Sequence, residues 1–322
     1  MSNKISNIGF KILRLPIIRS IVRFLKKYSL PGFSGVPIWD VMAFIYKEAM
    51  KDDLVTRANS IAFSFFLALF PALIFLFTLL PLLPFTANYL ELLDTSLKGM
   101  LPDNAHNYLF GIIQDVASIK RSGLLSIGFF FALFFSSSGV VTLMSGFDKT
   151  YDITFKKRSY IKTRVVAVLL TALLSTLLIC SLIFIILGKP ILGSAIHQLH
   201  LDDYGSIVLY AIRWFFVIMF IYLGITIIYH YAPSMYKKIS FWNVGSVLAC
   251  GLSIASSVAF AYFINNFGRY NELYGSIGAL IVIMLWLQIN AFILLVGFEL
   301  NASIAVNRDL REHERFKLLD LD

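Results

Sequence analysis

The sequence is short of charged residues, and acidic residues are the scarcest of them. Only 15% of its 322 residues are Asp, Glu, Lys or Arg, while 58% are hydrophobic and the mean hydropathy is +0.77. A soluble globular domain carries about a quarter charged residues. This composition therefore excludes a soluble enzyme or binding domain and indicates a membrane protein made largely of apolar spans.

Cysteine and catalytic motifs are equally scarce. Cys180 and Cys250 both lie inside apolar stretches and are interpreted as small apolar side chains, so they indicate nothing about the redox compartment. No P-loop, GxSxG, CxxC or HExxH motif is present, so ATP-driven pumping by the common route is excluded. His197 and His200, with Asp202 and Asp203, could hold a metal but are interpreted as solvated loop residues. The sequence thus predicts no enzyme, and no catalytic, cofactor or metal site.

What the sequence does contain is six long apolar stretches. A bilayer core of about 30 Å needs about 20 apolar residues as a helix, and each stretch meets that length. The sequence therefore predicts an all-α, six-span helical bundle. The stretches are Leu54–Phe85, Leu124–Phe147, Val165–Leu187, Ile207–Tyr231, Phe241–Phe267 and Tyr274–Val306.

Lys and Arg alternate between rich and poor along the connections. They are dense before the first span, in connections two and four, and in the tail, and sparse elsewhere. Cytoplasmic segments keep such residues, which predicts a multi-pass protein with both termini in the cytoplasm. The net charge of +9 then serves topology and contact with anionic phospholipid at the cytoplasmic face rather than nucleic acid.

Three regions follow from this pattern. Residues 1–52 are expected to form cytoplasmic amphipathic helices at the membrane surface, because Ile5, Ile8, Ile12 and later apolar residues recur at helical spacing. A second short helix is expected from Pro37 to Lys51. Residues 53–306 form the transmembrane domain, with an exported helical connection at 86–123, and residues 307–322 form a charged cytoplasmic tail.

Polar residues inside the spans are the candidate functional residues. In span one, Arg57, Ser64 and Pro71 share a helical stripe, and Pro71 frees a backbone carbonyl near mid-membrane. Spans two and five carry stripes of small residues, read either as close helix packing or as a pathway lining. These stripes are Gly128, Ala132, Ser136, Gly139, Gly146 and Gly245, Ala249, Ser253, Ser256.

Span six is polar on two roughly opposite faces, one with Gln288 and Glu299 and the other with Asn290 and Asn301. Exposing either polar face to lipid would cost free energy, so this helix is predicted to lie at the centre of the bundle. Ionisable residues in a membrane are costly and are functional candidates. Glu299 and Arg57 are predicted to share a network, either as a structural ion pair or in gating. Arg213, in span four, either extends toward the outer surface or meets an anionic substrate.

Several of these segments resemble the YihY/BrkB family of bacterial inner-membrane proteins, formerly labelled ribonuclease BN-like. The segments are Thr56–Phe63 with Phe70 and Pro71, Tyr229–Pro233, Tyr274–Ala279, Leu285–Leu287 and Gly297–Ala302. The resemblance covers most of Val41–Val306. It implies a six-span bundle in the bacterial inner membrane with both termini in the cytoplasm, and some relatives are suspected of moving lipids.

The ribonuclease label fits these residues poorly, because RNA hydrolysis needs metal-binding clusters or an acid–base pair. The predicted cytoplasmic side offers mainly Lys and Arg, with a lone His313 in the tail. Three functions stay open: a transporter of a lipid or other amphiphile, a small-ion or solute channel or carrier, and a non-transporting scaffold. The substrate and the oligomeric state do not follow from these residues.

Overall fold

The structure, a computed structural model, describes residues 23–51, 54–79, 111, 122–198, 205–266 and 268–319. Six of the helices in these ranges are long and apolar enough to cross a membrane. This confirms the predicted all-α fold with six candidate spans. The helices are α3 (Ile38–Lys51), α4 (Leu54–Leu79), α7 (Ser122–Gly146), α8 (Tyr160–Gln198), α9 (Gly205–Tyr231), α10 (Val244–Asn266) and α11 (Gly268–Leu319).

The helix bounds differ from the apolar stretches mainly at the ends. The short helix predicted from Pro37 is present as α3. The last helix does not stop with the apolar stretch at Val306 but continues to Leu319, because its charged end packs on other segments, as described below. The amphipathic segment over residues 1–22, and the exported connection apart from Gly111 and residues 122–123, lie outside the described residues.

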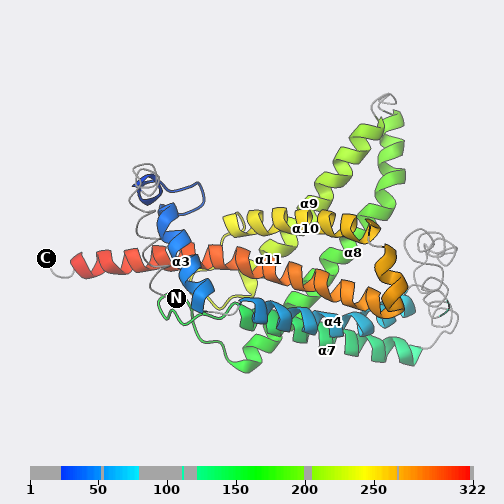
Figure 1. The fold of residues 1–322 in the computed structure, drawn as a ribbon, viewed down its shortest axis with the longest axis horizontal. Coiled ribbons are helices and arrows are strands. Elements are labelled where there is room, and N and C mark those ends of the chain that lie inside the picture. The colour runs from blue at the N-terminus through cyan, green and yellow to red at the C-terminus, as the bar shows by residue number, and fades with distance from the viewer. Residues whose placement is uncertain are drawn as a thin grey trace.

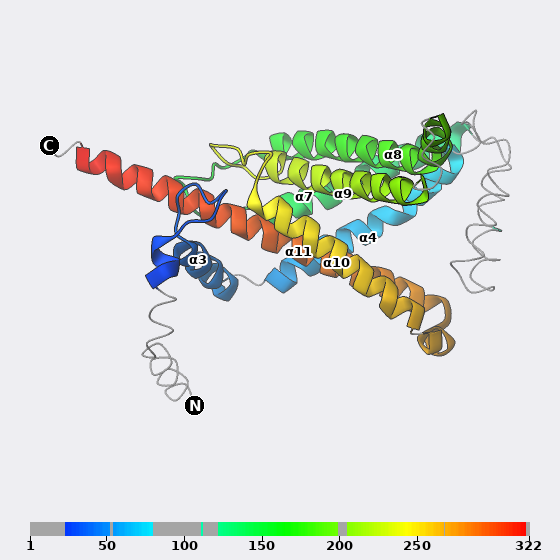
Figure 2. The same cartoon turned by 90° about the horizontal axis from the view of Figure 1, so that it is seen from above.

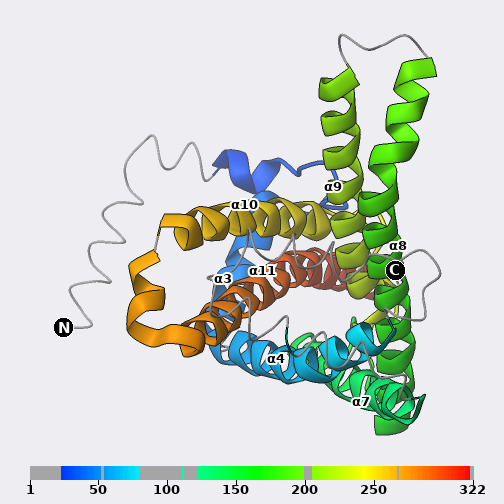
Figure 3. The same ribbon diagram turned by 90° about the vertical axis from the view of Figure 1, so that its right-hand side faces the viewer.

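The spanning helices lie in three neighbouring pairs, α4 with α7, α8 with α9, and α10 with α11 (Figure 1). Contacts of α11 with α4 and of α7 with α8 join these pairs. The pairs lie close together near α3 and diverge toward the other end of the molecule (Figures 2 and 3). We call the first end the basic end. It comprises α3, residues 147–159, residues 232–243 and residues 307–319.

The hydrophobic core lies in the half of the bundle nearest the basic end. Phe147, Tyr229 and Phe298 are buried there, and the rings of Phe147 and Phe298 stack with centroids 4.2 Å apart. Away from this end, described side chains such as Phe130, Phe215 and Tyr262 are exposed. Among the described side chains, close packing is therefore concentrated at the basic end.

Helices α10 and α11 cross very closely. A Cβ on Gly245 would overlap the backbone oxygen of Gly297, and a Cβ on Gly297 would lie 2.8 Å from Cβ of Ala249. The Tyr229 hydroxyl donates to the carbonyl of Leu294 at 2.7 Å beside this crossing. Small residues therefore serve helix packing here, as one reading of the sequence stripes predicted.

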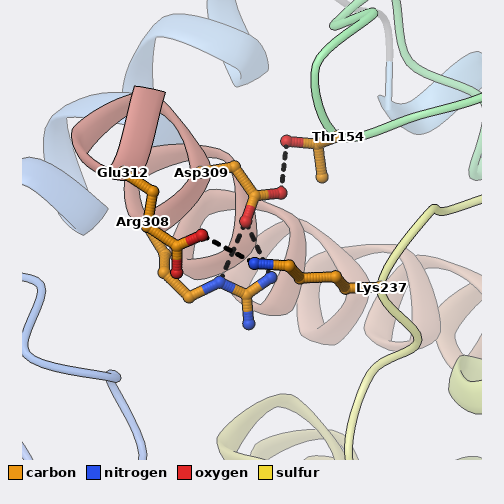
Figure 4. A network of polar contacts seen from close by, with 5 residues as sticks. All are labelled: Thr154, Lys237, Arg308, Asp309 and Glu312. Carbon is orange, nitrogen blue, oxygen red and sulfur yellow. Dashed lines mark hydrogen bonds and ion pairs between the residues drawn. The ribbon is translucent and has the colours of Figure 1, made fainter. Parts of the chain in front are cut away.

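The charged end of α11 ties several segments together (Figure 4). Asp309 accepts from the Thr154 hydroxyl at 2.9 Å and pairs with Arg308. Lys237 donates to Glu312 at 2.6 Å, and this bond lowers the pKa of the Glu312 carboxyl. On another side, Arg311 pairs with Asp40 of α3 at 2.6 Å, and Ser303 donates to the carbonyl of Val41 at 3.0 Å.

Candidate functional site

Glu299 of α11 is the centre of a buried charge network. Its side chain is 1% exposed, and its Oε1 lies 2.6 Å from Nζ of Lys149, whose side chain is 2% exposed. Arg57, in the first turn of α4, approaches the same oxygen with Nη1 at 3.9 Å and also donates to the carbonyl of Gly146 at 3.2 Å. One carboxylate thus joins α11, α4 and the segment that follows α7.

The network places Arg57 and Glu299 together, as the sequence predicts, but the closest partner is Lys149. In the sequence, Lys149 is one of several cations in the connection after span two, all explained by topology. No sequence signal sets it apart from its neighbours. In the structure it lies two residues after Phe147, whose ring stacks on that of Phe298, the residue before Glu299. Two cations therefore meet one carboxylate in a packed environment, and the Asp148 carboxylate also interacts electrostatically with Arg57.

Beside this network, a polar cavity of about 520 Å³ lies at the basic end. Its wall comes from the end of α7, residues 148–158 and the segment after α9. Desolvation raises the pKa of the Asp148 carboxyl, an effect that Arg158 and Arg57 oppose. Desolvation likewise lowers the pKa of Arg158, against the influence of Asp148. The cavity therefore combines partly desolvated charges of both signs.

A second hollow, of about 490 Å³, is apolar and lies between α7 and α8. Phe130, Phe131 and Phe134 line it, together with Arg164 in the second turn of α8. The Arg164 guanidinium lies 4.8 Å from the Phe134 ring centroid and donates to the Ser138 hydroxyl at 3.0 Å. Since Phe130 is 68% exposed, the hollow belongs to the surface of the bundle. The arrangement offers one cation within an apolar surface.

The other sequence candidates are dispersed. Asn301 accepts from the backbone N–H of Gly245 at 3.0 Å and donates to Asn243, which accepts from the N–H of Ser246 at the start of α10. Asn301 therefore helps to cap a helix. On the opposite face Glu299 meets the α4 network, so α11 is central, as predicted.

Hydroxyl and amide groups in the spans bond largely to their own helices. Ser64 donates to the carbonyl of Ser60 and also contacts the Thr142 hydroxyl at 3.0 Å. Asn290 donates to the carbonyl of Trp286 at 2.9 Å. Pro71 lies within α4, Gln288 is half-buried on α11, and Arg213 is exposed on α9. The structure thus unites Arg57 and Glu299 but not the remaining candidates.

The metal alternative for the His197 cluster lies outside the described side chains. Within the part of the chain that the structure describes, no three His, Cys, Asp or Glu side chains gather as they would around a metal ion.

The family model and the similar proteins found by comparison agree with one another. Residues 45–317 match the family model described as virulence factor BrkB. The ribonuclease-like protein YfkH of Bacillus subtilis (strain 168) is 29% identical over 271 residues, which cover 82% of this chain and 92% of YfkH. A UPF0761 membrane protein of Tolumonas auensis is 24% identical over 84% of this chain and 87% of its own length. No solved structure matches.

Proposed function

The chain belongs to the virulence factor BrkB family, and from that premise we propose that it moves a lipid or other amphiphile across the bacterial cytoplasmic membrane. The observation that carries this proposal is the hollow between α7 and α8. Its three phenylalanines offer an apolar surface for acyl chains, while the Arg164 guanidinium offers a positive charge for an anionic headgroup. A cation placed in an apolar surface at membrane depth is costly unless it meets polar or anionic groups.

The burial pattern supports the same function. The core is concentrated near the basic end, whereas many described apolar side chains farther along the spans are exposed, including Phe215 and Tyr262. Diverging apolar helices leave surface that acyl chains can cover (Figure 3). The buried Lys149–Glu299 pair would close the basic end, so a headgroup would travel along the lipid-facing side of the bundle rather than through its centre.

An ion or solute channel is less well supported. A hydrated pathway needs polar groups that face a common space. Among the described residues, Ser60, Ser64, Ser138 and Asn290 instead donate to carbonyls four residues earlier in their own helices. Such bonds satisfy the hydroxyl and amide groups within the helix. The scaffold alternative predicts no movement of either ions or lipid.

The positive-inside pattern supports placing the basic end in the cytoplasm. In this orientation the Arg164 hollow begins near the cytoplasmic leaflet, where anionic lipids are enriched. The proposed substrate is therefore an anionic amphiphile present in that leaflet.

Lipid movement can be measured with the purified chain in liposomes. The liposomes would carry a trace of phosphatidylglycerol with a fluorescent acyl chain, and a membrane-impermeant reductant would quench the outer leaflet. Protein-dependent quenching beyond the outer-leaflet share supports the proposal. Quenching that stops at the level of empty liposomes contradicts passive movement of this lipid, and an ion-flux assay on the same liposomes then separates a channel from a scaffold.

A further inference from the structure

The polar cavity at the basic end has features that the proposed lipid movement does not use. Its wall contains four cations, two carboxylates and several hydroxyl groups. Lys149 is already engaged with Glu299. Lys156 and Lys157 are exposed, and neither has an ion-pair partner among the described residues. The cavity wall therefore includes two lysines that have no ion-pair partner in the part of the chain that the structure describes.

Ser234 gives an independent indication of a ligand. It lines the cavity, is 5% exposed, and its hydroxyl has no hydrogen-bond partner within the described part of the chain. A buried hydroxyl without a partner costs about 1–3 kcal/mol relative to a satisfied one. Such a group, beside lysines that lack an ion-pair partner among the described residues, is suited to donate to an oxyanion.

The cavity is also built on a fixed backbone. Residues 154–156 join residues 234–236 through Lys156 N–H to Ser234 O at 2.8 Å and Tyr236 N–H to Thr154 O at 3.1 Å. The Arg158 guanidinium donates to the carbonyls of Ala232 and Pro233, each at 3.2 Å. These bonds fix the backbone that carries Ser234, Lys156 and Lys157, so binding would require little ordering of the main chain.

We infer that this cavity binds a phosphate-bearing ligand, with the Ser234 hydroxyl and the Lys156 and Lys157 amines as its donors. A phosphate group offers several acceptor oxygens and up to two negative charges, which match a hydroxyl and two ammonium groups. The ligand is either a soluble phosphate or the headgroup of a phospholipid. The site stands whether or not the chain moves lipid, because it requires binding alone.

The test uses the purified full-length chain and two probes. Radiolabelled inorganic phosphate is measured by equilibrium dialysis of the chain in detergent. Dioctanoyl phosphatidic acid is measured by native mass spectrometry, with dioctanoyl phosphatidylcholine as the reference lipid. Saturable binding of inorganic phosphate identifies a soluble ligand, and selective binding of phosphatidic acid alone identifies a lipid headgroup.

The variants separate a site from diffuse charge. Replacing both cavity lysines, Lys156→Gln with Lys157→Gln, should weaken binding by about tenfold or more, since bonds to charged groups are the strong ones. Replacing Lys237 and Lys238 with Gln removes the same charge from the same end outside the cavity and should weaken binding by less than about twofold.

The variant Ser234→Ala keeps every charge and should still weaken binding several-fold. The inference is overturned if neither probe binds saturably to the unmodified chain. It is also overturned if the two double-lysine variants lose affinity equally, because binding would then reflect overall charge. Neither result bears on the liposome assay, so failure of this site and failure of lipid movement are distinguishable.

Discussion

Glu299 shows at the scale of a single residue how buried charge is organised in this chain. Its carboxylate lies 2.6 Å from the Lys149 amine and 3.9 Å from the Arg57 guanidinium. A buried ion pair adds little net stability compared with apolar packing, yet removing one partner leaves a costly unpaired charge. The network should therefore be revealed by the difference between single and double substitutions.

We expect Glu299→Gln to destabilise the protein by about 3–5 kcal/mol, because it removes the negative charge that lies 2.6 Å from the buried Lys149 amine. The double variant with Lys149→Gln should lose clearly less than the sum of the two single variants. Thermal unfolding in detergent measures all three. Additive losses would show that the two side chains are not coupled.

Asp148 supports a prediction about pH. Desolvation raises the pKa of this carboxyl in the folded protein. Its contribution to stability is therefore present below the unfolded-state pKa and is lost as pH rises through the folded-state pKa. Because the side chain of Asp148→Asn cannot titrate, the melting temperature of this variant should rise relative to that of the unmodified chain as pH increases from about 4 to 8. A constant difference across this range would contradict the raised pKa.

Residue-level prediction from sequence succeeded where a charge was unusual for its surroundings. Glu299 and Arg57 lie in or beside apolar stretches, so their pairing could be predicted. Lys149 could not be distinguished, because a lysine in a basic connection looks like its neighbours. The same holds for Arg164 and Ser234, whose surroundings arise only when distant segments pack together.

At the scale of elements, the crossing of α10 and α11 depends on two glycines. Gly245 has no room for a Cβ against the backbone of Gly297, whereas Gly251 of the same helix has no neighbouring atom within 4 Å of its would-be Cβ. The two positions differ in packing but share helical conformation, which makes them a matched pair.

We expect Gly245→Ala to destabilise the protein by about 1–3 kcal/mol, because the added methyl group forces the helices apart. Gly251→Ala should be neutral or slightly stabilising, since alanine favours a helix. Thermal unfolding of both variants in the same detergent makes the comparison. Equal effects at the two positions would contradict a packing role for Gly245.

The length of each apolar stretch predicted that it forms a helix, but it did not predict the residues at which the helix begins and ends. Hydropathy marks where a helix can leave the membrane, not where its hydrogen bonding stops. Helix α11 extends past Val306 because Asp309, Arg311 and Glu312 find partners on three other segments. Those partners are 75 to 271 residues away in the sequence, so periodicity within the helix cannot reveal them.

At the scale of the whole molecule, the proposed orientation places the basic end in the cytoplasm. A variant without its own cysteines, Cys180→Ala with Cys250→Ala, can carry a single new cysteine at either end. We expect a membrane-impermeant maleimide to label Asn104→Cys in intact cells. Lys238→Cys should be labelled only after the membrane is opened. Labelling of Lys238→Cys in intact cells would reverse the orientation.

The arrangement of the six spans could not be predicted from the sequence. Stripes of small residues indicate that helices approach closely but do not identify their partners. In the structure Gly139 and Gly146 of α7 face Phe65 and Ile61 of α4, while Gly245 faces α11. The three pairs diverge away from α3 (Figures 2 and 3).

The most direct test of the central claim is the rate of phosphatidylglycerol movement in liposomes with one substitution in the hollow. Arg164→Gln removes the cation that lies against Phe134, whereas Lys162→Gln removes a cation from an exposed position on the same helix. We expect Arg164→Gln to slow movement by about tenfold, from the loss of a charge-assisted contact, and Lys162→Gln to leave it unchanged. Equal rates in the two variants, or no protein-dependent movement in the unmodified chain, would contradict the proposed function.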